Sequence, residues 1–330
     1  MRRLLTTAAV ATAAALTLTA CGTTEPAADN DDAKKAGEAI TLTDASGKKV
    51  ELDGPAKKVV GTEWHEVELL VSLGVDPVGV ADVKGYNTWD TAVPLKNEPK
   101  DIGTRGEPSM DTIAALAPDL IVASTDLPPA AVKQLRKVAP VLEVRSADAS
   151  DPIGQMTENL DLIAKATGTS DQAEKIKDEF DAKVAEGKKA LADAGLDGAE
   201  FAFADGYDIS NQVSIRPFTS GSLIGAVNEE LGLKNAWTVK GDKDYGLGTT
   251  DVEGLTKLGD DVQFAYIAND GDKSSTPFTA TGALSKDKVW TSLPFVKKGN
   301  VHRLPDGIWM FGGQESMGAY IDALVKELTK

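Results

Sequence analysis

Arginine is scarce in this chain, so an arginine in a turn or at a strand end is a candidate for binding chemistry. Only five arginines follow residue 20: Arg105, Arg136, Arg145, Arg216 and Arg303. Arg105 lies between Gly103 and Gly106 in a predicted turn, just before a predicted helix that starts near Ser109. Because a guanidinium group is always charged and carries a fixed fork of donors, Arg105 could bind paired oxygen atoms of a ligand. The alternatives are a loop cap or an ion pair with Glu107.

Arg216 and several aromatic residues are the other candidates for a binding site. Arg216 precedes Pro217 at a predicted strand end, where it could be a second donor, suited to an anionic citrate-type ligand, or part of a structural ion pair. Tyr86 and Trp89 lie in a polar loop, where a core position is hard to arrange. The other aromatic residues that could line a cleft or fill a core are Trp64, Trp237, Trp309, Tyr207 and Tyr245. Trp290 is predicted to pack inside a helical segment.

The residue types needed for most covalent chemistry are missing from the sequence. Cys21 is the only cysteine and His65 and His302 are the only histidines, which leaves no disulfide and too few ligands for a protein-held metal site. The sequence has no Gly-x-Ser-x-Gly elbow, no phosphate-binding loop ending in Lys-Ser/Thr and no His-Glu-x-x-His motif. The net charge of −16 disfavours nucleic acid as a partner. These absences do not exclude an enzyme, but the sequence shows no catalytic machinery.

The N-terminus has the pattern of a secretory signal. Arg2 and Arg3 precede an uncharged stretch over residues 4–20, which is too short to cross a membrane. The ending Leu18-Thr19-Ala20-Cys21 resembles a bacterial lipobox, which implies cleavage before Cys21 and a lipid with acyl chains such as palmitate on its sulfur. We predict a signal peptide over 1–20, a flexible tether over 21–38, and an anchor in the outer face of the cytoplasmic membrane, in a Gram-positive type of cell.

The remaining chain predicts an α/β protein in two similar halves. Residues 111–122 form a short amphipathic helix, a turn and an apolar strand, and residues 253–264 repeat this pattern 142 residues later. Between the halves, residues 152–194 have helical spacing, interrupted at Gly168. We predict an N-terminal lobe over 39–152, a connecting helix over 153–168 and a C-terminal lobe over 169–330.

A series of short motifs in a fixed order resembles the siderophore-binding lipoproteins of bacterial iron-uptake ABC transporters. The motifs are Glu63-Trp64, Leu73-Gly74-Val75, Tyr86-x-x-Trp89, Gly103-Thr-Arg105, Asn235-Ala236-Trp237, Leu293-Pro294-Phe295 and Ile308-Trp309. The similarity covers nearly all of residues 40–328 and is nearest to the hydroxamate and citrate–hydroxamate binders. It implies a bilobal fold whose two α/β lobes are joined by one long helix, with a ligand cleft between them.

The resemblance also implies a role for particular residues. Arg105 would contact the oxygen ligands of a ferric siderophore. Arg216 and Tyr86 are further candidate donors on the strength of their residue types and positions, and the resemblance does not supply them. The cleft walls would be Trp64, Trp89, Trp237 and Trp309. Asp111 and Glu253 would dock the two lobes onto an ABC permease dimer, although the family usually has glutamate at the first position. Ala123 and Asp126 would leave one wall without the aromatic residues of ferrichrome binders.

We expect a monomeric receptor, not an enzyme, that has no resident cofactor, binds a ferric siderophore and hands it to the permease. Ferric citrate and cobalamin are alternative cargoes of the same fold. A haem carrier would need an axial ligand, for which His65 and Tyr245 are the candidates. A secreted hydrolase is the alternative from another functional class.

Overall fold

The computed structural model describes residues 38–210 and 212–330. The chain divides into two units, Met1–Lys35 and Ala36–Lys330, and the fold presented here is that of the second unit. The predicted signal peptide, Cys21 and all of the tether except Glu38 lie outside the described residues. Within them, no helix is long and apolar enough to span a membrane.

The first lobe is built on a parallel five-stranded sheet with the order β5-β4-β3-β6-β7. Its central strand β6 is buried at every residue, which matches the continuous apolar run that a parallel sheet covered on both faces requires. A separate antiparallel hairpin, β1–β2, precedes the sheet. The strands of this lobe are β1 (Ile40–Thr43), β2 (Lys49–Leu52), β3 (Val59–Gly61), β4 (Gly79–Val80), β5 (Lys100–Asp101), β6 (Leu120–Ser124) and β7 (Val141–Val144).

Four helices accompany these strands: α1 (Trp64–Ser72), α2 (Val83–Trp89), α3 (Met110–Leu116) and α4 (Pro129–Leu135). Helix α1 begins with a capping box in which the Glu66 carboxylate accepts a hydrogen bond from the backbone N–H of Glu63 over 2.7 Å. This cap fixes Glu63 and Trp64 at the end of β3, the carboxyl edge of a parallel sheet, where ligands commonly bind.

The second lobe repeats this plan with one antiparallel strand added. The parallel strands have the order β10-β8-β11-β12, and β9 pairs antiparallel with β8. The strands are β8 (Glu200–Ile209), β9 (Gln212–Pro217), β10 (Lys234–Asn235), β11 (Gln263–Ile267) and β12 (Val301–Leu304). The helical segments are α7 (Leu223–Glu230), η1 (Glu253–Lys257), η2 (Lys273–Ser275), η3 (Ala283–Lys286), α8 (Lys288–Ser292), α9 (Pro294–Lys297) and α10 (Gln314–Leu328).

The predicted repeat is present in the structure. Helix α3 leads into β6 in the first lobe, and η1 leads into β11 in the second. The second copy is a 3₁₀ segment instead of an α-helix. Helices α1 and α7 both end at a Leu-Gly pair, with Gly74 and Gly232 at φ angles of 78° and 87°, in the left-handed region that glycine adopts most readily.

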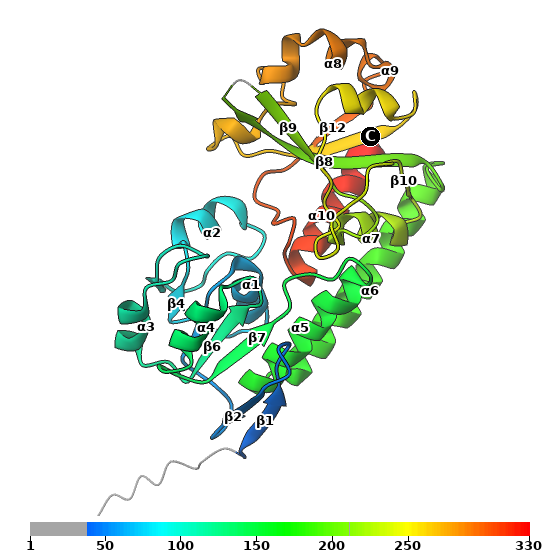
Figure 1. Cartoon of the computed structure of the whole chain (residues 1–330). Helices are drawn as coiled ribbons and strands as arrows, with labels where there is room; N and C mark the ends of the chain where they lie inside the picture. Colours follow the sequence, from blue (N-terminus) through cyan, green and yellow to red (C-terminus); the bar gives the residue numbers. More distant parts are fainter. Residues whose placement is uncertain (1–37, 211) are drawn as a thin grey trace, which may run out of the picture. The chain divides into compact units, whose positions relative to one another are not determined.

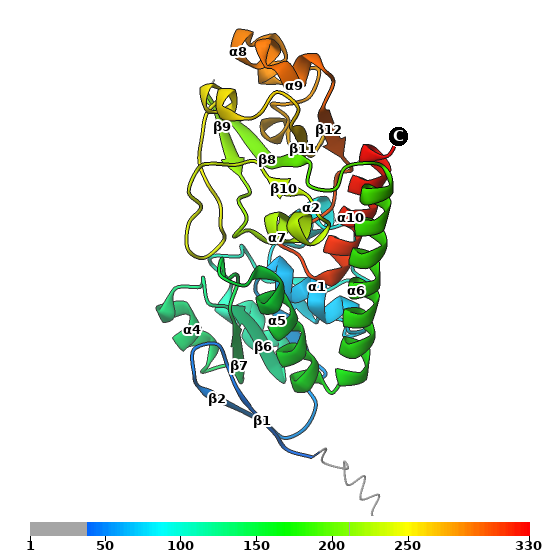
Figure 2. The ribbon, with the colours of Figure 1, turned by 90° about the vertical axis from the view of Figure 1, so that its right-hand side faces the viewer.

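Two helices lie between the lobes in sequence, α5 (Pro152–Thr167) and α6 (Ser170–Asp193), and Gly168 in the left-handed conformation separates them. The sequence placed the connection at 153–168. In the structure both helices contact both cores. Helix α5 packs Leu160 in the core of the first lobe and Met156 in that of the second, and the longer α6 packs Ile176 in the first and Phe180 in the second. The assignment of the connection to 153–168 therefore stays a prediction. Helix α6 runs along both lobes, with α10 beside its later part (Figures 1 and 2).

Candidate ligand-binding cavity

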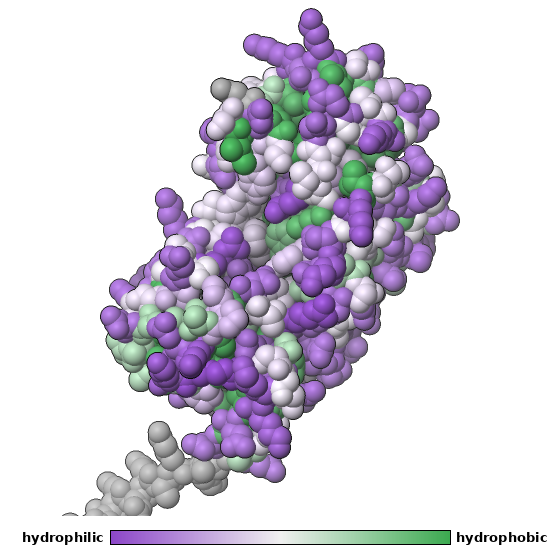
Figure 3. Space-filling model, viewed as in Figure 1, coloured by the Kyte–Doolittle hydropathy of each residue, from purple (hydrophilic) through white to green (hydrophobic). Residues whose placement is uncertain are grey.

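A cavity of about 420 Å³ lies between residues of the two lobes. This volume falls within the range of small-molecule sites. On the face shown in Figure 3, hydrophobic and weakly polar residues lie in the hollow between the lobes, and hydrophilic residues border it. The cavity is lined by Glu63, Trp64, His65, Glu66, Trp89, Arg105, Ser146, Tyr207, Arg216, Tyr245, Leu247, Asp272, Trp309 and Phe311.

Arg105 lines the cavity from the glycine-rich turn of the first lobe. Gly103 begins this turn at a φ angle of 100°, which an L side chain rarely adopts. Arg105 Nη1 donates to Glu63 Oε1 over 2.7 Å, so its partner is Glu63 and not Glu107. Its guanidinium carbon lies 3.9 Å from the ring centre of Trp64, within cation–π distance. The side chain is held by two contacts and keeps 36% of its surface exposed.

Arg216 lines the cavity from the second lobe, and the register of the β8–β9 pair explains its partner. Asp205 and Arg216 are directly opposite in the antiparallel ladder. Arg216 Nε donates to Asp205 Oδ1 over 2.9 Å, and Nη2 donates to Oδ2. Burial raises the pKa of the Asp205 carboxyl, and the Arg216 charge opposes this shift. The guanidinium carbon also lies 5.3 Å from the ring centre of Phe311.

Three of the four predicted tryptophans line the cavity. Trp64 and Trp309 form an edge-to-face pair with ring centres 4.8 Å apart. They are only 4% and 8% exposed, so they form a packed floor. Trp89 is half-buried and joins this floor from α2. Aromatic surfaces of this kind suit the carbon flanks of a ligand.

Two predicted contact residues lie elsewhere. Tyr86 is fully buried, and its phenol donates to the carbonyl of Val93 over 2.6 Å. Trp237 donates from Nε1 to the carbonyl of Phe203 and packs against Phe264, in the core of the second lobe. The loop position of Tyr86 was misleading because residues 83–89 fold into α2, whose apolar side faces the core. Neither residue is part of the cavity.

The two candidate axial ligands for haem both line the cavity with their polar atoms engaged. His65 Nδ1 lies 3.2 Å from the Phe311 carbonyl, and Nε2 lies 3.1 Å from the Asn159 amide nitrogen. Burial lowers the pKa of His65 to about 4, so the imidazole is neutral. The Tyr245 phenol donates to Asp126 of the first lobe, and burial raises its pKa. Tyr245 therefore stands at the wall that the sequence left without an aromatic residue.

A buried carboxyl pair joins α1, the end of α2 and the start of α10. Glu68 accepts hydrogen bonds from Ser316 N over 3.0 Å and from Ser316 Oγ over 2.9 Å. Asp90 lies on the other side of the same hydroxyl, 3.5 Å away. Burial raises the pKa of both carboxyls, and the neighbouring Glu68 raises that of Asp90 further. This junction fixes the first lobe against the last helix of the chain.

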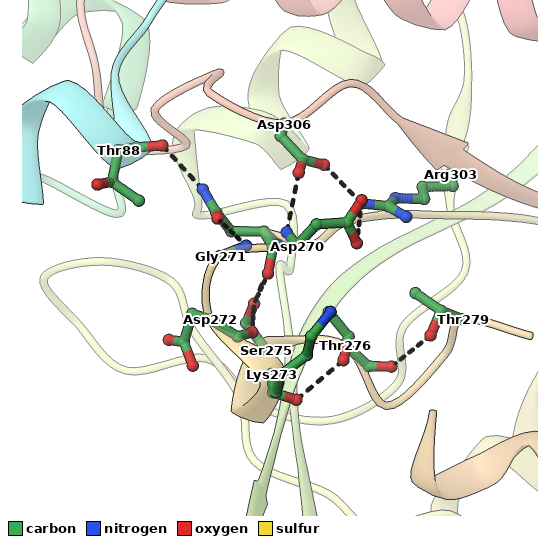
Figure 4. Close-up of polar contacts among 11 residues, drawn as sticks. Thr88, Asp270, Gly271, Asp272, Lys273, Ser275, Thr276, Thr279, Arg303 and Asp306 are labelled. Atoms are coloured by element: carbon green, nitrogen blue, oxygen red, sulfur yellow. Dashed lines mark hydrogen bonds and ion pairs between the residues drawn. The ribbon is translucent and has the colours of Figure 1, made fainter. Parts of the chain in front are cut away.

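A second contact between the lobes lies at the loop after β11 (Figure 4). Asn269 donates from Nδ2 to the Thr88 carbonyl of α2 over 2.8 Å. Arg303 pairs with Asp270 and Asp306 over 3.0 and 2.7 Å and supports the loop from behind. This loop carries Asp272 into the cavity lining.

The two predicted docking residues are both exposed. Asp111 lies in the first turn of α3, and Glu253 is the first residue of η1. They occupy matching positions in the repeat, away from the cavity lining.

Sequence reasoning missed the carboxyls of the site. Glu63 served only as part of a motif, and Glu66 and Asp205 were not considered. The Glu-x-x-Glu spacing at the start of α1 was a usable sign of a capped helix end, and hairpin pairing around residue 210 would have set Asp205 opposite Arg216. Within residues 38–210 and 212–330, no group of three or more potential ligand side chains is placed to hold a metal ion.

Comparison with known proteins gives a consistent set of matches. The profile of the periplasmic binding protein family matches residues 59–307. The Fe(3+)-citrate-binding protein YfmC of Bacillus subtilis is 29% identical over 265 residues, covering 79% of this chain and 77% of that protein. The iron(3+)-hydroxamate-binding protein FhuD of Escherichia coli is 26% identical over 268 residues, covering 81% and 85%.

A solved structure shares the fold. The crystal structure of the Fe3+–Desferal-bound siderophore-binding protein FhuD from Vibrio cholerae has a TM-score of 0.72 and 24% identity. The match covers 83% of this chain and 98% of that one. This likeness establishes that the two lobes and their connection follow the same fold.

Proposed function

This chain belongs to the periplasmic binding protein family, and from that premise we propose that it is a receptor that binds a ferric siderophore and delivers it to an ABC permease. The cargo is of the hydroxamate or citrate–hydroxamate type and binds in the cavity between the lobes. The observation that carries the proposal is the pair of guanidinium groups, Arg105 and Arg216, that enter one aromatic-floored cavity from opposite lobes.

The chemistry of a ferric siderophore fits this arrangement. Its iron is enclosed by oxygen ligands, and its flanks are carbon. A receptor therefore needs donors for the oxygens and flat apolar walls for the flanks, and it does not need to touch the metal. The fixed donor fork of arginine suits paired oxygens. The names of the relatives, which include a ferric citrate binder and a hydroxamate binder, support the same class of cargo.

Intrinsic tryptophan fluorescence tests this proposal, because Trp64, Trp89 and Trp309 line the cavity. Ferric trihydroxamates, a ferric citrate–hydroxamate and ferric citrate are titrated separately into the purified protein, with each iron-free ligand as its control. We expect saturable quenching at submicromolar concentration by at least one ferric complex. Quenching by none of them would overturn the proposal.

The location is also part of the proposal. The Leu18-Thr19-Ala20-Cys21 ending supports a lipid-anchored protein at the outer face of the cytoplasmic membrane. Metabolic labelling with a radioactive fatty acid is expected to mark the wild-type chain and not the Cys21→Ser variant. The protein acts in this proposal as a monomer without a resident cofactor.

A further inference from the structure

Both guanidinium groups of the cavity already have carboxylate partners. Arg105 is paired with Glu63 over 2.7 Å, and Arg216 makes a two-point contact with Asp205. Asp205 is only 3% exposed and lies behind Arg216. An anionic ligand would have to compete with Asp205, and displacing this partner would leave a buried carboxylate unpaired. The arginines therefore offer hydrogen-bond donors with their positive charge largely compensated.

Further carboxyls face the same cavity. Asp272 lines it from the loop after β11 and has no ion pair within the described part of the chain. Glu66 lines it from α1 and is 1% exposed, with one carboxyl oxygen bonded to the Glu63 N–H. Burial and the nearby Glu63 charge raise the pKa of Glu66. Among the described lining residues none is a lysine, and the buried His65 is neutral.

The cavity lining and its direct partners therefore hold more acidic than basic side chains. The two guanidinium groups are paired with Glu63 and with Asp205. Asp272 and the buried Glu66 add two further carboxyls to the lining. Asp126 of the first lobe adds an acidic group next to the lining, because it accepts the hydrogen bond of Tyr245, which lines the cavity. In a partly enclosed site these charges act at short range and are screened less than surface charges.

Building on the proposed function, we infer that this cavity selects ferric complexes whose net charge is zero or positive and rejects polyanionic ones. Within the proposed class, the rule favours the hydroxamate type over the citrate–hydroxamate type, whose ferric complex keeps negative charge from citrate. The favoured cargo is a neutral ferric trihydroxamate or one that ends in an ammonium group. Ferric citrate and ferric tricatecholates, which carry several negative charges, are disfavoured. This inference reverses the sequence-based suggestion that Arg216 suits an anionic ligand.

A matched series of ligands tests the charge rule without changing the iron centre. One linear trihydroxamate with a terminal amine is used as the free amine, as its N-acetyl form and as its N-succinyl form. Their ferric complexes carry one positive charge, no charge and one negative charge. We expect affinity to fall in that order, with a loss of about tenfold or more from amine to succinyl at low ionic strength. The difference should shrink at high ionic strength.

Two variants connect the rule to the named carboxyls. Glu63→Gln frees the Arg105 charge and should reduce the penalty for the succinyl form at least about threefold. Asp272→Asn, on a loop away from the Arg105 pair, should act in the same direction. Asp178→Asn, at an exposed position of α6 outside the cavity, is the matched control and should leave the series unchanged.

The outcomes separate this inference from the proposed function. Equal affinity for the three forms, or tighter binding of the succinyl form or of a ferric tricatecholate, would overturn the charge rule and leave the receptor function standing. Quenching by no ferric complex of any charge would overturn the receptor function itself. An unchanged charge series in both cavity variants would also contradict the rule.

Discussion

At the scale of single residues, the two arginines of the proposed site are held in place by contacts within the protein itself. Arg105 is held by Glu63 and by the face of Trp64, and Arg216 is held by Asp205. A side chain that is already ordered loses less conformational entropy on binding than a mobile surface lysine would. The carboxylate partners therefore serve orientation, and they also set the charge that a ligand meets.

The Arg105→Ala variant tests this role most directly. We expect affinity for the best ferric ligand to fall by about 1.5–3 kcal/mol, the scale of a hydrogen bond to a charged group. Fluorescence titration measures the change, and far-UV circular dichroism checks the fold. Arg145→Ala is the control, because Arg145 pairs with Asp148 and does not line the cavity. Equal affinities of the two variants would remove Arg105 from the site.

At the scale of elements, the start of α10 is fixed by carboxyls and not by an apolar contact alone. Glu68 of α1 holds Ser316, and Asp90 at the end of α2 lies beside them with Oδ2 unpartnered among the described residues. Because both carboxyls have raised pKa values, the folded protein binds protons more tightly than the unfolded chain. Stability from this junction is full below about pH 4 and is lost as the pH rises through the raised pKa values.

The Asp90→Asn variant should weaken the dependence of folding stability on pH. The wild-type Tm is expected to fall between about pH 5 and about pH 8, and the variant should fall less, by roughly 2–4 °C for each kcal/mol of coupling removed. Differential scanning fluorimetry over this pH range measures the difference. Asp178→Asn serves again as the exposed control. If the Tm of the Asp90→Asn variant falls with pH as steeply as that of the wild type, the Asp90 carboxyl is not a source of the pH dependence.

At the scale of the whole described unit, the two sheets share one long helix. Helix α6 packs Ala173 and Ile176 into the first core and Phe180 and Leu191 into the second. A continuous helix bends less readily than the strand hinges of other bilobal binders, so large closure around a ligand is disfavoured. With little closure, the ligand meets the cavity nearly as it is in the free protein. Under the proposed function, the charges of the cavity would then bear directly on which ferric complex binds.

The repeat also predicts how the loaded protein docks. We expect the double variant Asp111→Lys, Glu253→Lys to bind the ferric ligand with unchanged affinity and to lose about tenfold or more of iron uptake in cells that carry the cognate permease. Uptake of radioactive iron and fluorescence titration measure the two properties. Asp178→Lys is the control for added positive charge. Normal uptake by the double variant would rule out docking through these carboxylates.

Local patterns in the sequence were sufficient to predict several of the helices and strands. The apolar run at Leu120 predicted β6, and the break at Gly168 predicted the end of α5. These features depend on neighbours within a few residues, where periodicity and turn chemistry decide the conformation. The glycine-rich setting of Arg105 likewise marked it as a candidate that the cavity now includes.

Only the tertiary structure decided which candidates meet and what charge they present. Tyr86 and Trp237 look like cavity residues in the sequence, yet Tyr86 is buried in a core and the partly buried Trp237 packs against another core. The partners of the two arginines come from positions 42 and 11 residues away, and Tyr245 reaches Asp126 across 119 residues. The physical reason is that the pattern of apolar residues in a sequence indicates only which positions are buried. The partner of a charged side chain depends on which distant segments pack together, and the local pattern does not contain that information.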